Sequence, residues 1–125
     1  MLTNNNPIRV LVVDDSMVAR NLITQGLASH PRIQVVGTAI NAVDAKSKID
    51  RLSPDVVTMD VEMPGVNGIE FLKQYLPTHP VPVILVSSLN LRVFDALAAG
   101  AVDFVRKPDG TERTPSFLHA LAQKK

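Results

Sequence analysis

Residues of chemically active types stand at the ends of short apolar runs in this sequence, namely Asp14, Asp15, Asp60, Ser87 and Lys107. Carboxylate oxygens are hard ligands that suit Mg²⁺, and the pattern places no cysteine or histidine beside them that would favour a softer metal. The Lys107 ammonium group offers a compact positive charge for a phosphoryl oxygen, and the Ser87 hydroxyl can donate a hydrogen bond to another. These residue types predict phosphoryl transfer to a carboxylate, with Mg²⁺, or Mn²⁺ in its place, as cofactor.

Asp60 is the residue that we predict to accept the phosphoryl group. An aspartate can act as a nucleophile and form an acyl phosphate, and Asp60 ends the central predicted strand, between the acidic pair and the serine and lysine. Asp14 and Asp15 are expected to hold the metal, directly or through water, because a divalent cation removes the repulsion between crowded carboxylates. The backbone carbonyl of Glu62, just beyond Asp60, is a further candidate ligand.

Alternating strand-like and helical segments position these residues. Runs rich in β-branched residues predict strands at 8–13, 33–39, 55–59, 83–86 and 101–105. Ser16 and Asn41 are predicted helix caps, and the first helix has Val18, Leu22, Ile23 and Leu27 at helical spacing. Further helices are predicted at 69–76, 91–99 and 115–123. This order predicts an α/β fold with a parallel sheet between helices, whose strands share one carboxyl edge where ligands bind.

The bulk composition fits a single folded domain. The chain has 125 residues, 46% of them hydrophobic and 20% charged. A net charge of +1 gives no reason to expect nucleic acid or a membrane as partner. The absence of cysteine excludes disulfides and fits a cytoplasmic location, as does the lack of an apolar signal core near the N-terminus. We expect a flexible N-terminus at residues 1–7 and one domain at 8–125, with a possible linker start near 109–115.

Four motifs resemble the response-regulator receiver family: VLVVDDS at 10–16, DVVTMDVEMPGVNG at 55–68, VILVSS at 83–88 and GAVDFVRKP at 100–108. The resemblance runs from Arg9 to about Gly110 and is specific because the motifs occur together. It implies a flavodoxin-like (βα)5 doubly wound sheet with strand order 2-1-3-4-5, an order that is carried over from the family.

The resemblance also implies a role for each matching position. Asp60 matches the phosphoacceptor, Asp14 and Asp15 the acidic metal pair, and Lys107 the family's lysine. Ser87 matches the switch hydroxyl, and Phe104 the aromatic residue whose rotamer follows it. A partner histidine kinase would donate the phosphoryl group. The surface near the fourth helix, fifth strand and fifth helix would then change its preference for an output domain or partner protein.

Within that family, the closer resemblance is to the receiver of the chemotaxis protein-glutamate methylesterase, carried by DVEMPG, VSSL and GAVDFVRKP. The chain lacks the G-x-S-x-G segment of a hydrolase nucleophile. It is therefore expected either to regulate a methylesterase domain outside this sequence or to act as a stand-alone response regulator. No independent catalytic domain is expected here, only self-catalysed phosphotransfer to Asp60 and dephosphorylation.

Other interpretations remain open at this point. A haloacid-dehalogenase-like phosphatase also uses aspartate, lysine and Mg²⁺, although that family places its nucleophile after the first strand. A flavodoxin-like binder of flavin or nucleotide would need a Gly-rich or hydroxyl-rich phosphate loop, which the first loop lacks. Taken singly, each polar residue has an ordinary explanation as a helix cap, a turn residue or a surface lysine. Met17, Met59 and Met63 are expected to be packing residues.

Overall fold

The computed structural model describes residues 7–61, 68–87, 100, 101 and 103–106, with the backbone alone at Ser87 and at 103–106. Its five parallel strands lie in the order β2-β1-β3-β4-β5, which confirms the predicted fold class and strand order. The strands are β1 (Ile8–Val13), β2 (Ile33–Ala39), β3 (Val56–Asp60), β4 (Val83–Ser87) and β5 (Asp103–Arg106).

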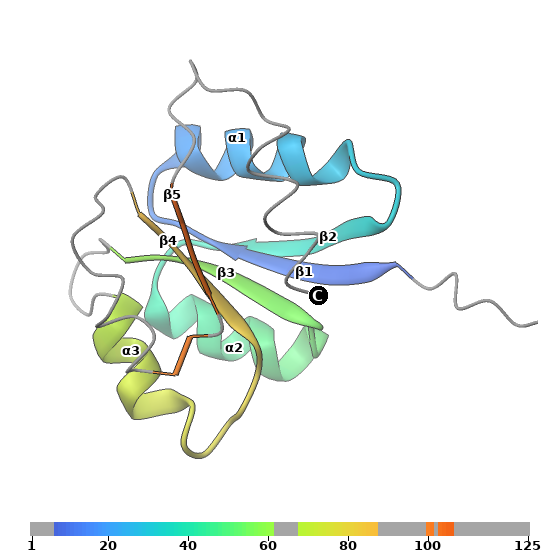
Figure 1. Ribbon diagram of the computed structural model, residues 1–125. Helices are drawn as coiled ribbons and strands as arrows, with labels where there is room; N and C mark the ends of the chain where they lie inside the picture. Colours follow the sequence, from blue (N-terminus) through green and yellow to red (C-terminus); the bar gives the residue numbers. More distant parts are fainter. Residues whose placement is uncertain (1–6, 62–67, 88–99, 102, 107–125) are drawn as a thin grey trace, which may run out of the picture.

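Helices cover both faces of the sheet. The described helices are α1 (Met17–Ala28), α2 (Ala42–Leu52) and α3 (Gly68–Tyr75). Figure 1 shows α1 on one face of the sheet and both α2 and α3 on the other. The helices predicted at 91–99 and 115–123 and the boundary expected near 109–115 lie outside the described residues. Of the helices that the structure describes, none combines the length and the apolar character that a bilayer crossing requires.

Apolar side chains pack into a core on each face of the sheet. Leu11, Val57 and Met59 lie in the core beneath α2 and α3, whereas Val12 and Ile84 lie in the core beneath α1. Side chains of successive strand residues point to opposite faces, so strands that are buried on both sides are apolar along their whole length. This double burial explains why apolar runs predicted the central strands β3 and β4, in which Val56 to Asp60 and Val83 to Val86 are buried.

Side-chain caps start the first two helices as predicted. The Ser16 side chain accepts a hydrogen bond from the Ala19 N–H at 3.2 Å. The Asn41 side chain accepts one from the Asp44 N–H at 2.8 Å. Each cap satisfies a backbone donor that the first helical turn leaves without an intrahelical partner. Because Ser16 and Asn41 follow shortly after the ends of β1 and β2, both helices begin close to the carboxyl edge of the sheet.

Some element details differ from the sequence predictions. Strand β3 includes Asp60 and starts after Asp55, whose carboxylate accepts a hydrogen bond from the Arg9 N–H at 2.9 Å. On α1, the predictions that Val18 shares the apolar face and that Met17 packs were wrong, because 70% of Val18 and 64% of Met17 are exposed. The buried face of α1 is formed by Ala19, Ile23, Gly26 and Leu27.

Candidate functional site

The register of the central strands brings the predicted acidic residues together. Val13 of β1 lies opposite Met59 of β3, so the next residue of each strand, Asp14 and Asp60, lies at the same edge. Carboxylate oxygens of Asp14, Asp15 and Asp60 all lie within 4.8 Å of one another. We call these residues the acidic cluster.

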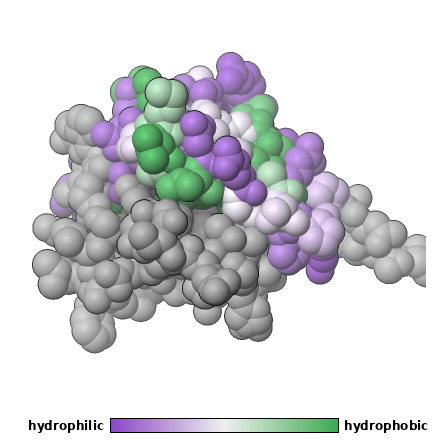
Figure 2. Space-filling view, turned by 90° about the horizontal axis from the view of Figure 1, so that it is seen from above, coloured by the Kyte–Doolittle hydropathy of each residue, from purple (hydrophilic) through white to green (hydrophobic). Residues whose placement is uncertain are grey.

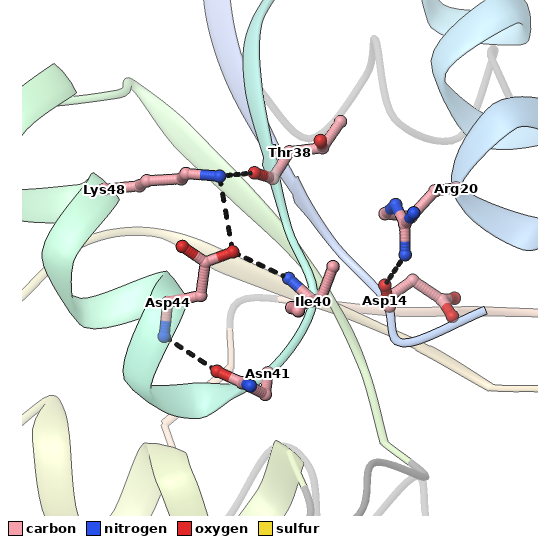
Figure 3. A network of polar contacts seen from close by, with 7 residues as sticks. All are labelled: Asp14, Arg20, Thr38, Ile40, Asn41, Asp44 and Lys48. Atoms are coloured by element: carbon pink, nitrogen blue, oxygen red, sulfur yellow. Dashed lines mark hydrogen bonds and ion pairs between the residues drawn. The ribbon is translucent and has the colours of Figure 1, made fainter. Parts of the chain in front are cut away.

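Asp14 is fully buried and held at several atoms. Its Oδ1 accepts a hydrogen bond from the Ser16 N–H at 2.9 Å. Its own N–H donates to the Ala39 carbonyl at 3.0 Å, which ties the end of β1 to the end of β2. The Arg20 guanidinium donates to the Asp14 carbonyl at 3.0 Å (Figure 3). Main-chain and side-chain contacts therefore fix this residue before any ligand arrives.

Asp60 is 2% exposed and lies against the start of α3. The Gly68 N–H donates to the Val61 carbonyl at 2.8 Å, and the Val61 N–H donates to the Val86 carbonyl at 3.0 Å. A Cβ atom placed on Gly68 would lie 2.6 Å from the Asp60 carbonyl oxygen. The helix therefore reaches the end of β3 this closely because position 68 has no side chain.

The acidic cluster has the chemistry of a site for a hard divalent cation. Its ligand atoms are carboxylate oxygens, two of the three residues are buried, and Asp15 is exposed. Mg²⁺ is commonly held by one or two carboxylates, with waters and phosphate oxygens completing its coordination. A buried side and an exposed side suit this arrangement, because solvent and substrate can approach from the Asp15 side. The residues present therefore fit Mg²⁺.

The loop between β2 and α2 is held by its own polar network, which Figure 3 shows beside the Asp14–Arg20 contact. The Lys48 ammonium group donates to the Thr38 carbonyl and pairs with the Asp44 carboxylate at 3.3 Å. The same carboxylate accepts a hydrogen bond from the Ile40 N–H at 3.1 Å. These contacts fix the loop that begins beside the Ala39 carbonyl.

The remaining predicted site residues are described only in part. Ser87 ends β4 and its backbone pairs with Arg106, one position beyond the pair formed by Asp60 and Val86. The backbone of Phe104 lies in β5 opposite Leu85. Glu62 and Lys107 lie outside the described residues. The strand register thus brings the backbone at Ser87 to the same edge as Asp60.

Arg20 is a neighbour of the site that the sequence pattern did not indicate. An arginine in the first turns of a surface helix is ordinarily a solvated residue. Its contact is with a main-chain carbonyl, and no residue type at the receiving position marks such a contact. Spacing offered one signal, because Arg20 follows Asp14 closely enough to reach back across the first turn of α1.

Comparisons with known proteins show which family the chain resembles. Residues 10–118 match the response regulator receiver domain family. The chain is 50% identical over 102 residues to a protein-glutamate methylesterase/protein-glutamine glutaminase of Syntrophomonas wolfei, covering 82% of this chain and 30% of that protein. It thus spans about a third of the length of such relatives.

Solved structures show the same fold. The response regulator domain of Thermotoga maritima CheB aligns with a TM-score of 0.84 and 42% identity, over 95% of this chain and 96% of that one. A chain from the complex between the P1 domain of CheA3 and CheY6 of R. sphaeroides aligns with a TM-score of 0.81 and 28% identity. That alignment covers 94% of this chain and 95% of the other.

Proposed function

The chain belongs to the response regulator receiver domain family, and from this we propose that it accepts a phosphoryl group on Asp60 in a reaction that requires Mg²⁺. The observation that carries the proposal is the burial of Asp60 within 4.8 Å of two further carboxylates. Such crowding is costly without a cation and useful with one, because a bound cation neutralises charge on the transferred group.

Different residues of the chain are proposed to attack the phosphoryl group, to hold Mg²⁺ and to contact the phosphoryl oxygens. A carboxylate oxygen of Asp60 attacks phosphorus while the bond from phosphorus to the donor's histidine nitrogen breaks, and that nitrogen then takes up a proton. The product is an acyl phosphate on Asp60. Asp14 and Asp15 would hold Mg²⁺, together with the Glu62 carbonyl, and the ion would offset negative charge on the phosphoryl oxygens. Lys107 and Ser87 are proposed to contact those oxygens.

Intact-mass measurement tests this proposal. The protein is incubated with acetyl phosphate and MgCl₂, and its mass should rise by one phosphoryl group. Asp60→Asn, which keeps the size of the side chain but removes the nucleophile, should gain none, and an excess of EDTA should suppress the gain in the unsubstituted protein. An unmodified wild type, or an equal gain in Asp60→Asn, would contradict the assignment.

A histidine kinase is the proposed phosphodonor. Large exposed apolar side chains lie close to the acidic cluster, with Met17 and Val18 at the start of α1 and Ile40 and Val43 around the start of α2. Figure 2, viewed from the side of α1, shows hydrophobic groups lying among hydrophilic ones on the α1 face of the molecule. We call these four residues the apolar rim, and propose that the donor protein packs on it while its phosphohistidine reaches Asp60.

Regulation of an output domain is the proposed consequence. Phosphorylation would favour one of two conformations that already exist, with Ser87 and Phe104 coupling Asp60 to the surface near the fourth helix, β5 and the fifth helix. Because the curated relatives are methylesterases about three times as long as the match, a methylesterase domain is the proposed output. We further propose that residues 8–125 form the receiver unit and that it acts in the cytoplasm.

A further inference from the structure

We infer that Arg20 is a positioning residue for the acidic cluster, setting its affinity for Mg²⁺ through the peptide group that joins Asp14 to Asp15. This inference rests on the proposed requirement for Mg²⁺. The evidence is the hydrogen bond of 3.0 Å from the Arg20 guanidinium to the Asp14 carbonyl (Figure 3). In that view the guanidinium meets Asp14 at the main chain and not at the carboxylate.

That carbonyl controls the direction of two ligands at once. The Asp14 carbonyl belongs to the planar peptide unit that continues into Asp15, so its orientation fixes ψ of Asp14 and φ of Asp15 together. Carboxylate oxygens of these two residues lie within 4.8 Å of each other and of one from Asp60, which is close enough for them to share a cation. A rotation of this peptide plane would separate them. One hydrogen bond from a side chain therefore restrains the geometry of the pair.

Arg20 is the side chain whose removal can test this restraint. Two other contacts of Asp14 are made by main-chain groups, the Ser16 N–H at 2.9 Å and the Ala39 carbonyl at 3.0 Å. Substitution of a side chain leaves these in place. The backbone of Arg20 is fixed in the first turn of α1 by its own hydrogen bond to the Ser16 carbonyl at 2.9 Å. The guanidinium thus links the helix start to the strand end.

The geometry also predicts which substitutions preserve the effect. Arginine places a planar fork of donors at the end of a long side chain. Glutamine is too short to reach the same carbonyl from the same Cα position. Lysine has a similar reach and keeps the charge, but it has a single rotating ammonium group. We therefore expect Arg20→Gln to lose the restraint and Arg20→Lys to keep part of it.

Mg²⁺ titration of the metal-free protein, followed by NMR of backbone amides, measures the effect directly. Arg20→Gln should weaken Mg²⁺ binding about tenfold, the lower end of the range for residues that orient metal ligands. Arg20→Lys should fall between Arg20→Gln and wild type. Arg51→Gln removes an exposed arginine from α2 and should bind like wild type. Asn41→Ala, which removes the α2 cap, controls for a general loss of stability.

A second readout separates positioning from chemistry. The rate of phosphorylation by acetyl phosphate, measured as Mg²⁺ is raised, should reach the wild-type maximum in Arg20→Gln at about tenfold more Mg²⁺. Unchanged Mg²⁺ affinity in Arg20→Gln would overturn the inference, as would an equal weakening in Asn41→Ala. Wild-type protein that binds no Mg²⁺ would instead overturn the proposed function, and this inference with it.

Discussion

The acidic cluster brings three carboxylates within 4.8 Å of one another. Asp15 is its exposed member, so Asp15→Asn removes charge with little loss of packing. Without a divalent cation, we expect this change to raise the free energy of unfolding by about 0.5 to 1 kcal/mol, because repulsion at an exposed position is screened by solvent. In Mg²⁺ the order should reverse and wild type should have the higher free energy of unfolding. Mg²⁺ at a hundred times its Kd adds about 2.7 kcal/mol to the stability of a protein that binds it.

Urea unfolding in EDTA and in MgCl₂ measures this reversal of the two stabilities. Asp50→Asn is a suitable control because Asp50 is an exposed acid near the end of α2, away from the cluster. That variant should gain as much stability from Mg²⁺ as wild type does. If Mg²⁺ stabilises Asp15→Asn as much as it stabilises wild type, Asp15 is not part of the metal site.

Tyr75 offers a second test at the scale of single residues. Burial raises the pKa of Tyr75, and the nearby Asp50 carboxylate raises it further. The Tyr75 hydroxyl donates to Asp50 Oδ1 at 3.4 Å, and the ring stacks between Phe71 and His79. The chain has a single tyrosine and no tryptophan, so its ultraviolet absorbance reports this phenol alone.

Absorbance titration should place the pKa of Tyr75 above its ordinary value of about 10. Asp50→Asn should lower that pKa but not restore it fully, because burial is the larger cause. Because the pKa of Tyr75 is raised in the folded state, the folded protein keeps the proton of the Tyr75 hydroxyl up to a higher pH than the unfolded protein does. The resulting stability is present below about pH 10 and is lost as pH rises through the folded pKa. Tyr75→Phe should lose less stability above this pH than wild type.

Single residues divide into those that the sequence indicates and those that it does not. The three acids could be predicted because parallel strands end at one edge, and the structure brings their carboxylates within 4.8 Å. Arg20 could not, because its partner is a main-chain carbonyl. The exposure of Met17 and Val18 was also unpredictable from hydrophobicity alone, since it depends on how α1 is rotated over the sheet.

At the scale of elements, the closest approach in the site is between the start of α3 and the end of β3. A Cβ on Gly68 would lie 2.6 Å from the Asp60 carbonyl oxygen and 3.1 Å from the Val61 Cα, both of them backbone atoms. Backbone cannot swing aside as a side chain can. Gly68→Ala should therefore cost about 1 to 3 kcal/mol of stability, the usual cost of overpacking, and should slow phosphorylation because Asp60 must move.

Gly37→Ala is the matched control for this prediction. Its added Cβ would lie 2.9 Å from Leu52 Cδ1, which is the end of a side chain that can rotate. Alanine is also favoured over glycine within a strand by about 0.5 to 1 kcal/mol. Urea denaturation should show a clearly smaller loss for Gly37→Ala than for Gly68→Ala. Equal losses of stability in the two variants would mean that the close approach of position 68 to the Asp60 backbone is not the cause of the loss in Gly68→Ala.

The elements themselves were largely predictable from the pattern. The limits of β1 and β2 agree with the sequence prediction, because β-branched and other apolar residues make up most of both runs. β3 begins and ends one residue later than predicted, since its ladder with β4 continues through Asp60 and Val86. β5 is likewise displaced, to Asp103–Arg106. Ladder ends depend on hydrogen bonds to neighbouring strands, which composition does not encode.

At the scale of the whole molecule, the apolar rim should decide which phosphodonors react quickly. Val18 is 70% exposed and Val43 77% exposed, so neither packs in the core, and polar substitutions there should change stability by less than about 0.5 kcal/mol. A donor protein would bury these side chains, whereas acetyl phosphate is too small to contact them. The double variant Val18→Asn and Val43→Asn adds no charge near the acidic cluster.

Transfer from a phosphorylated histidine-kinase P1 domain should slow about tenfold or more in this variant, since burying two valine side chains stabilises a complex by about 1.5 kcal/mol or more each. The rate with acetyl phosphate should remain that of wild type, because the acidic cluster is intact. Quenched-flow measurement of both reactions, on the same protein preparation, separates the two effects. Equal slowing with both donors would show that the substitutions disturb the site itself, and unchanged rates would place the donor on another surface.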